Sequence, residues 1–209
     1  MKGTRMFAGC KIVDLSPELV PGKEDRRLAI REYVHEADKT YMHEIDTMSH
    51  VGVHIEAPSH YKRHLTDVSA LPLSAFIGDA VRLNVKSVGK GRPILPEHIR
   101  KLARTGVKKN DILLLYSPYF GKDSPYISRA LAEWMARLPV KMLGIANSIG
   151  LEEPKHMFTH DLLMRKDIPL IERIENLEKL PERFIFIGFP LRIKGLDSSP
   201  IRAVALVKK

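Results

Sequence analysis

The sequence has one cysteine, no glutamine and no long apolar run. Cys10 has no second cysteine to pair with, which excludes a disulfide within the chain. No apolar stretch approaches the roughly 18 residues of a membrane-spanning helix, and the first residues show no signal-peptide pattern. The sequence therefore predicts a cytoplasmic protein without a membrane partner.

Amide side chains are also scarce, with only four asparagines, whereas lysine, arginine and glutamate are plentiful. Few thermolabile amides and many charged residues are typical of proteins from thermophiles. The chain has 209 residues, of which 44% are hydrophobic and 28% charged. This composition is that of a globular protein and excludes disorder as the default state. We expect one domain spanning residues 1–209.

Basic residues outnumber acidic ones by 34 to 25, for a net charge of +9. A positive chain can indicate a nucleic-acid-binding module. The densest basic stretch, residues 86–109, alternates with apolar residues, as in a solvated helix face with flanking loops. It carries no recognised nucleic-acid motif. We therefore expect no nucleic-acid partner and keep this function as the weaker alternative.

Residue periodicity predicts an α/β protein that is rich in strands and has two or three helices. The predicted strands or extended segments are 11–16, 41–58 with an interruption at Gly52, 80–85, 111–116, 140–146, 168–174, 184–193 and 201–207. The predicted helices are 96–104, 124–138 and 160–165. The charged stretch 21–39 is expected to be a loop with a short helix at 26–33.

Three of the nine histidines fall within eleven residues: His50, His54 and His60, with Glu56 between them. Imidazole and carboxylate groups together are the ligands that divalent transition metals prefer. On a straight strand His50 and His54 would lie roughly 13 Å apart, too far to share one ion. A bend at Gly52, which tolerates unusual backbone angles, would bring them together.

In the bent chain, His54 and Glu56 point to the same side of one strand. A helix is the less suitable alternative, because Val51, Val53 and Pro58 all disfavour it. Taken alone, these residues could equally be structural histidines with hydrogen-bonded partners. The other histidines have no comparable context and are expected to be structural or solvated.

The stretch from His50 to His60 resembles the signature His-x-Gly-Thr-His-x-Asp-x-Pro-x-His of the metal-dependent cyclase family. That family includes bacterial kynurenine formamidase and isatin hydrolase. Segments 12–16, 71–81, 160–177, 186–195 and 199–205 also resemble family segments, in the same order. The resemblance thus covers nearly the whole chain. It implies a swivelling β/β/α domain that is usually a homodimer or homotetramer.

The resemblance also implies that two divalent metal ions share the carboxylate of Glu56. The first ion would also bind His50 and His54, and the second would bind His160 and Glu172. Zinc is the expected metal and manganese the alternative, with one or two ions per subunit.

The implied activity is hydrolysis of an amide, formamide, lactam or lactone bond in a small molecule, as in an arylformamidase. A metal would lower the pKa of a bound water and polarise the substrate carbonyl. His60 would be the general acid/base that carries a proton to the leaving group.

Three departures from the family pattern bear on this function. Val53 replaces the usual threonine, and Glu56 replaces the usual aspartate, with a side chain one methylene longer. The charged stretch 21–39 stands where the family has an aromatic segment, which makes an aromatic N-formyl substrate stacked on tryptophan less suitable. The alternative function is therefore a metal-binding protein of the same fold without hydrolase activity.

Overall fold

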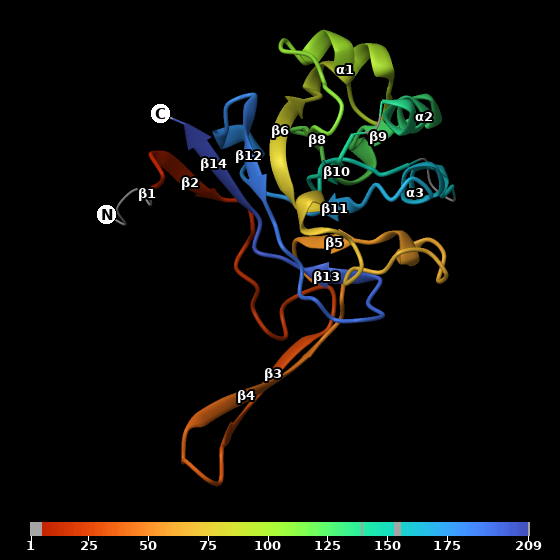
Figure 1. The fold of residues 1–209 in the computed structure, drawn as a ribbon. Helices are drawn as coiled ribbons and strands as arrows, with labels where there is room; N and C mark the ends of the chain where they lie inside the picture. The colour runs from red at the N-terminus through yellow and green to blue at the C-terminus, as the bar shows by residue number, and fades with distance from the viewer. Residues whose placement is uncertain (1–5, 139, 153–155, 209) are drawn as a thin grey trace.

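The computed structural model describes residues 6–138, 140–152 and 156–208. Its largest feature is one mixed sheet that curls through the molecule (Figure 1). In spatial order the strands are β1 (Met6–Phe7), β2 (Cys10–Asp14), β14 (Val204–Lys208), β12 (Arg183–Ile187), β6 (Ile77–Asn84), β8 (Ile112–Tyr116), β10 (Met142–Ile145), β11 (Leu170–Glu172), β5 (His54–Glu56) and β13 (Ser198–Pro200).

The centre of this sheet is parallel, from β6 through β8 and β10 to β11, and the strands on both sides of it are antiparallel. Every residue of β8, with the sequence Ile-Leu-Leu-Leu-Tyr, is buried. Such a continuous apolar run is expected of a parallel strand covered on both faces. Leu113 and Leu115 pack in the helix-side core, whereas Ile112 and Leu114 pack in the core on the other face.

Three α-helices are found among the described residues, and all contribute to the same core: α1 (Pro96–Leu102), α2 (Arg129–Arg137) and α3 (Phe158–Met164). A proline occupies the first turn of α1, where its missing N–H costs no helical hydrogen bond. None of the helices in the described ranges combines the length and apolar character of a membrane span. The predicted α/β class, rich in strands with two or three helices, is confirmed.

Helix α2 begins later than predicted. Ser128 caps it by accepting a hydrogen bond from the backbone N–H of Leu131 at 3.1 Å. The residues before it, Tyr126–Ile127, form strand β9, which pairs with β7 (Pro93–Ile94). The expected start at Ser124 was therefore wrong, because this segment finds its partner in a strand far away in the sequence.

The expected short helix at 26–33 was also wrong. Residues Leu28–Val34 form strand β3, which pairs with β4 (Tyr41–Thr47) in a separate two-stranded hairpin. Leu28, Ile30 and Val34 follow the two-residue period of a strand. Two further differences are that β12 ends at Ile187 and that β13 was not predicted.

Candidate metal centre

Strand β5 provides the centre of the site. It carries His54 and Glu56, two residues apart and therefore on the same side of the strand. Antiparallel pairing with β11 sets Glu172 directly opposite His54. Each of the two strands pairs with a neighbour on both sides, so the sheet fixes the positions of these side chains.

The predicted bend at Gly52 is confirmed and brings His50 back towards His54. Gly52 has a φ of +60°, and a Cβ there would lie 2.6 Å from a methyl carbon of Leu19. The backbone angle favours glycine, and a Cβ at this position would force the Leu19 side chain to move. The ring centroids of His50 and His54 are consequently 5.0 Å apart.

Two further histidines approach from outside the sheet. His60 ends the 3-10 turn Pro58–His60 that follows β5, and His160 lies on α3. Because α3 packs on the helix side of the sheet, His160 reaches the side of β5 that carries Glu56. The structure therefore brings together all six residues that the sequence analysis singled out, although His160 and Glu172 lie at least 100 residues after the other four in the chain.

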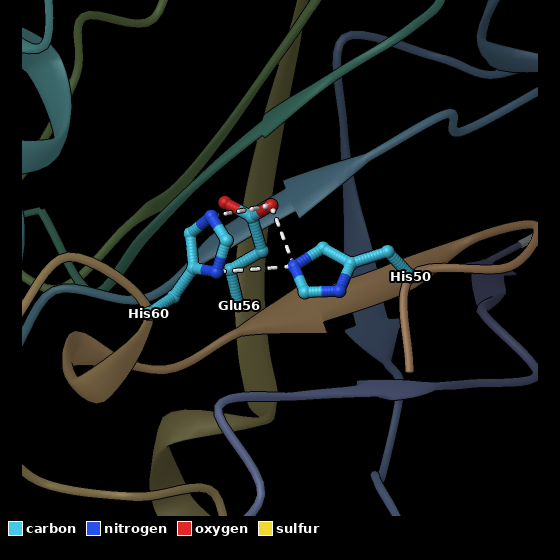
Figure 2. Close-up of side chains that lie close together, drawn as sticks. All are labelled: His50, Glu56 and His60. Carbon is cyan, nitrogen blue, oxygen red and sulfur yellow. Dashed lines mark hydrogen bonds and ion pairs between the residues drawn. The ribbon is translucent and has the colours of Figure 1, made fainter. Parts of the chain in front are cut away.

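Four imidazoles surround the carboxylate of Glu56, which is only 3% exposed. Figure 2 shows two of them, His50 and His60, facing it. All four present Nε2 to this carboxylate. The Nε2–oxygen distances are 3.4 Å for His50, 3.6 Å for His54, 3.6 Å for His60 and 3.4 Å for His160.

Two of these rings are oriented by a hydrogen bond from the opposite nitrogen. His54 Nδ1 donates to the backbone carbonyl of Gly52 at 2.8 Å. His160 Nδ1 donates to the carboxylate of Glu152 at 2.5 Å. Such partners are typical of histidine metal ligands, because they fix the ring and direct Nε2 at the ion.

The other two rings have polar partners as well. His50 Nδ1 lies 2.9 Å from the hydroxyl of Ser49. His60 Nδ1 lies 2.9 Å from the carboxylate of Asp197 and 3.1 Å from His50 Nε2. The contact with Asp197 favours a proton on Nδ1 of His60, which leaves its Nε2 free to exchange protons at the centre of the cluster.

Two buried polar atoms in this cluster have no hydrogen-bond partner among the described residues: His54 Nε2 and Glu56 Oε2. A buried polar atom without a partner is costly, so each such atom needs an explanation. A divalent cation among these atoms would satisfy both. The ligand types and the orphaned atoms therefore fit a metal centre.

Ligand geometry gives two groups of three atoms, each lying within 4.8 Å of one another. One group comprises His50, Glu56 and His60, and the other His54, Glu56 and Glu172. Glu56 belongs to both, as expected of a bridging carboxylate. The division differs from the expected one: His50 groups with His60, the expected proton carrier, instead of with His54, and Glu172 groups with His54 instead of with His160. His160 faces the other oxygen of Glu56. The individual metal-binding roles stay predictions.

The charged groups of the cluster shift one another's pKa values. Burial disfavours the charged form of Glu56, but the surrounding imidazoles, His160 foremost, outweigh it and hold the pKa of this carboxyl well below its usual range. Burial also opposes the charged form of His160, but Glu152 and Glu56 raise its pKa to about 9.

The pKa of the Glu172 carboxyl is shifted in the opposite direction to that of Glu56. Burial, reinforced by the negative charge of Glu56, raises the pKa of the Glu172 carboxyl. Two carboxylates that repel each other in a buried site are stabilised by a cation between them. The electrostatics of the site thus point to the same conclusion as its unpaired atoms.

Comparison with known proteins identifies the family. The family model named Cyclase matches residues 13–148. The chain belongs to the Cyclase family. A kynurenine formamidase of Bordetella avium is 30% identical over 171 residues, which cover 77% of this chain and 78% of that protein.

Solved structures agree with this assignment. Isatin hydrolase A of Labrenzia aggregata superimposes with a TM-score of 0.81 at 22% identity, covering 96% of this chain and 95% of that one. A structure described as a potential metal-dependent hydrolase with cyclase activity has a TM-score of 0.75 at 20% identity, covering 96% and 99%. The predicted family and its fold are confirmed.

Two residues of this Cyclase family site were missed by the sequence analysis. Glu152 orients His160, and Asp197 contacts His60. Burial opposes ionisation of Asp197, but His60 and His50 hold its pKa below the usual range. No local pattern marks Asp197, because 137 residues separate it from His60.

An open cavity of about 970 Å³ reaches the cluster on the side of His60. Asp197, Arg63 and His64 also line it. It gives a small molecule access to His60 while Glu56 stays buried behind the imidazoles. His60 is therefore the cluster member best placed to meet a substrate.

Proposed function

We propose that this protein is a metal-dependent hydrolase that cleaves an amide, formamide, lactam or lactone bond of a small molecule. The main supporting observation is the convergence of four imidazoles on the buried Glu56, with two polar atoms that have no hydrogen-bond partner among the described residues. Kynurenine formamidase and isatin hydrolase, to which the chain is similar, are named for substrates of this class. A formamide, lactam, simple amide or lactone would be the substrate.

The residues that would hold the metal are His50, His54, Glu56, His160 and Glu172. Three imidazoles with two carboxylates suit zinc first and manganese second, with one or two ions per chain. Bound there, the metal would lower the pKa of a water molecule and polarise the scissile carbonyl. Glu152 would keep Nε2 of His160 directed at Glu56.

His60 would act as the general base and then as the general acid. With a proton on Nδ1 held by Asp197, its Nε2 accepts a proton from the attacking water and returns it to the leaving nitrogen or oxygen. His60 is the member of the cluster that faces the open cavity, so its ring can reach both groups. Asp197 would act through His60, as a positioning residue.

The direct test is a substrate screen on protein loaded with zinc or with manganese. It would include an N-formylated arylamine, an aryl-fused lactam, a simple lactone and an unreactive peptide as control. We expect turnover of at least one of the first three, loss of turnover on chelation, and recovery when metal is restored. His156→Ala, an exposed histidine outside the cluster, should match the wild type.

A screen that stays blank with metal bound would contradict the proposal and favour the non-hydrolytic alternative. The expected homodimer or homotetramer, the cytoplasmic location and the thermophilic source stay predictions.

A further inference from the structure

The cavity beside His60 carries a positive charge that no acidic side chain of the described residues neutralises. Arg63 is the one lysine or arginine among the residues that line this cavity, and it is exposed. Its guanidinium forms no ion pair or hydrogen bond with another side chain in the described part of the chain. A guanidinium is charged at any ordinary pH and has five N–H donors. These donors are therefore available to a ligand in the cavity.

The two acidic residues that line the same cavity are occupied by other contacts. Asp67 accepts three hydrogen bonds from its own wall of the cavity, among them one from the backbone N–H of Gly195 at 2.8 Å. Asp197 holds Nδ1 of His60 at 2.9 Å. Each carboxylate thus has a structural role in the wall. Arg63 is left as the charged group of this cavity whose partner is missing among the described residues.

The backbone that carries Arg63 is held in place by hydrogen bonds. The backbone N–H of Leu65 donates to the carbonyl of Lys62 at 2.8 Å, so Arg63 occupies a central position of a tight turn. At the base of this turn, the backbone N–H of Ser59 donates to the carbonyl of Thr66 at 3.0 Å and closes the loop. The position of the arginine relative to the metal cluster is therefore set before any ligand binds, which lowers the entropic cost of binding.

Arg63 is close enough to His60 for one small molecule to contact both. Three residues of chain span at most about 11 Å between Cα atoms, and both side chains line the same cavity. A substrate whose scissile bond lies at Nε2 of His60 can therefore place a second group at the guanidinium. Residues 61–70 lie between the signature that ends at His60 and the next segment that resembles the family, so this contact is not part of the resemblance.

We infer that Arg63 determines substrate specificity by binding a carboxylate of the substrate, and that this contact places the scissile bond at His60. The inference rests on the proposed hydrolase function. The planar guanidinium donates two parallel hydrogen bonds to a carboxylate, which fixes the direction of the substrate as well as its charge. A singly charged carboxylate suits the cavity better than a phosphate, because Asp67 and Asp197 already contribute negative charge there.

Steady-state kinetics of the metal-loaded protein test this assignment with formanilide and its three carboxylated isomers, the formamidobenzoates. We expect kcat/KM for at least one isomer to exceed that for formanilide by about tenfold or more, mainly through a lower KM. Arg63→Gln should reduce this ratio to about one, and Arg63→Lys, which keeps the charge without the planar fork, should give an intermediate ratio. Lys62→Gln removes the neighbouring positive charge, which does not line the cavity, and should keep the wild-type ratio.

Failure of the inference can be told apart from failure of the proposed function. If the compounds are hydrolysed but the wild-type ratio is near one, or Arg63→Gln keeps the wild-type ratio, Arg63 does not determine specificity. If none of the four is hydrolysed, calorimetric titration of the same compounds decides about Arg63 separately. At least one formamidobenzoate should then bind the wild type about tenfold or more tightly than Arg63→Gln. Equal affinities, or no binding to the wild type, would overturn the inference.

Discussion

The same kind of side-chain pair occurs in two regions of this molecule with opposite surroundings. In the hairpin, His43 Nε2 lies 3.5 Å from Glu32, and both side chains are about half exposed. In the cluster, His160 Nε2 lies 3.4 Å from Glu56, and the two side chains are 8% and 4% exposed. The first pair is solvated and contributes little to the stability of the fold. The second is part of a buried network of charged groups that influence one another. Burial and convergence, rather than residue type or distance, distinguish the candidate metal centre.

The largest effect is expected when the negative charge at the centre of the cluster is removed, and the same change in the hairpin pair serves as the comparison. Glu56→Gln keeps the shape of the side chain but removes the carboxylate shared by both ligand groups. We expect loss of bound metal and of all measurable hydrolysis, since the glutamine amide has no negative charge and offers one ligand oxygen instead of two. Glu32→Gln should keep the full metal content. Elemental analysis of both variants by mass spectrometry is the measurement.

The next largest effect is expected on the rate of catalysis rather than on metal binding. His60→Ala should lower kcat by about 10²–10⁴-fold, the usual contribution of a general acid/base, while the protein keeps its metal. Steady-state kinetics measure kcat, and metal analysis of the same preparation measures the bound metal. If the variant turned over at the wild-type rate, His60 would not be the proton carrier.

A smaller effect is expected from the residue that orients a ligand. Glu152→Gln should weaken metal affinity by about 10–100-fold, because His160 loses the carboxylate that fixes its ring. Competition with a chelating dye measures this affinity. Asp197→Asn is the matched comparison: it should lower kcat and leave the metal affinity near the wild-type value. Equal metal affinities for Glu152→Gln and the wild type would exclude the positioning role.

The smallest effect belongs to the exposed ion pair of the hairpin. Glu44→Gln removes the partner of Arg31, and both side chains are more than half exposed. We expect the free energy of unfolding to change by less than about 0.5 kcal/mol. Denaturant unfolding of the two proteins at equal concentration gives this difference. A loss of several kcal/mol would contradict the description of this ion pair as solvated.

The sequence was most informative where the site is local. Four of the site residues lie within eleven residues of the sequence: His50, His54, Glu56 and His60. On a straight strand His50 and His54 would lie too far apart to share an ion, and this distance predicted the bend that Gly52 provides. His160 and Glu172 could be added only by resemblance to the family. Their approach depends on α3 packing and on the pairing of β5 with β11, which no local pattern encodes.

Other features needed the tertiary structure entirely. Asp197 and Glu152 stand in segments without a periodic pattern, so their roles emerge only from contacts with His60 and His160. In β3 the charged residues favoured a helix, but pairing with β4 decided the conformation. Long-range strand pairing overrides local propensity in this way because propensity differences are small.

The central claim is that the cluster around Glu56 binds a divalent metal. Metal content per chain, measured by mass spectrometry on untagged protein purified without chelator, tests it most directly. We predict one or two equivalents of zinc or manganese, with two supporting a bridging Glu56. No bound metal, even after incubation with zinc and with manganese, would contradict the account.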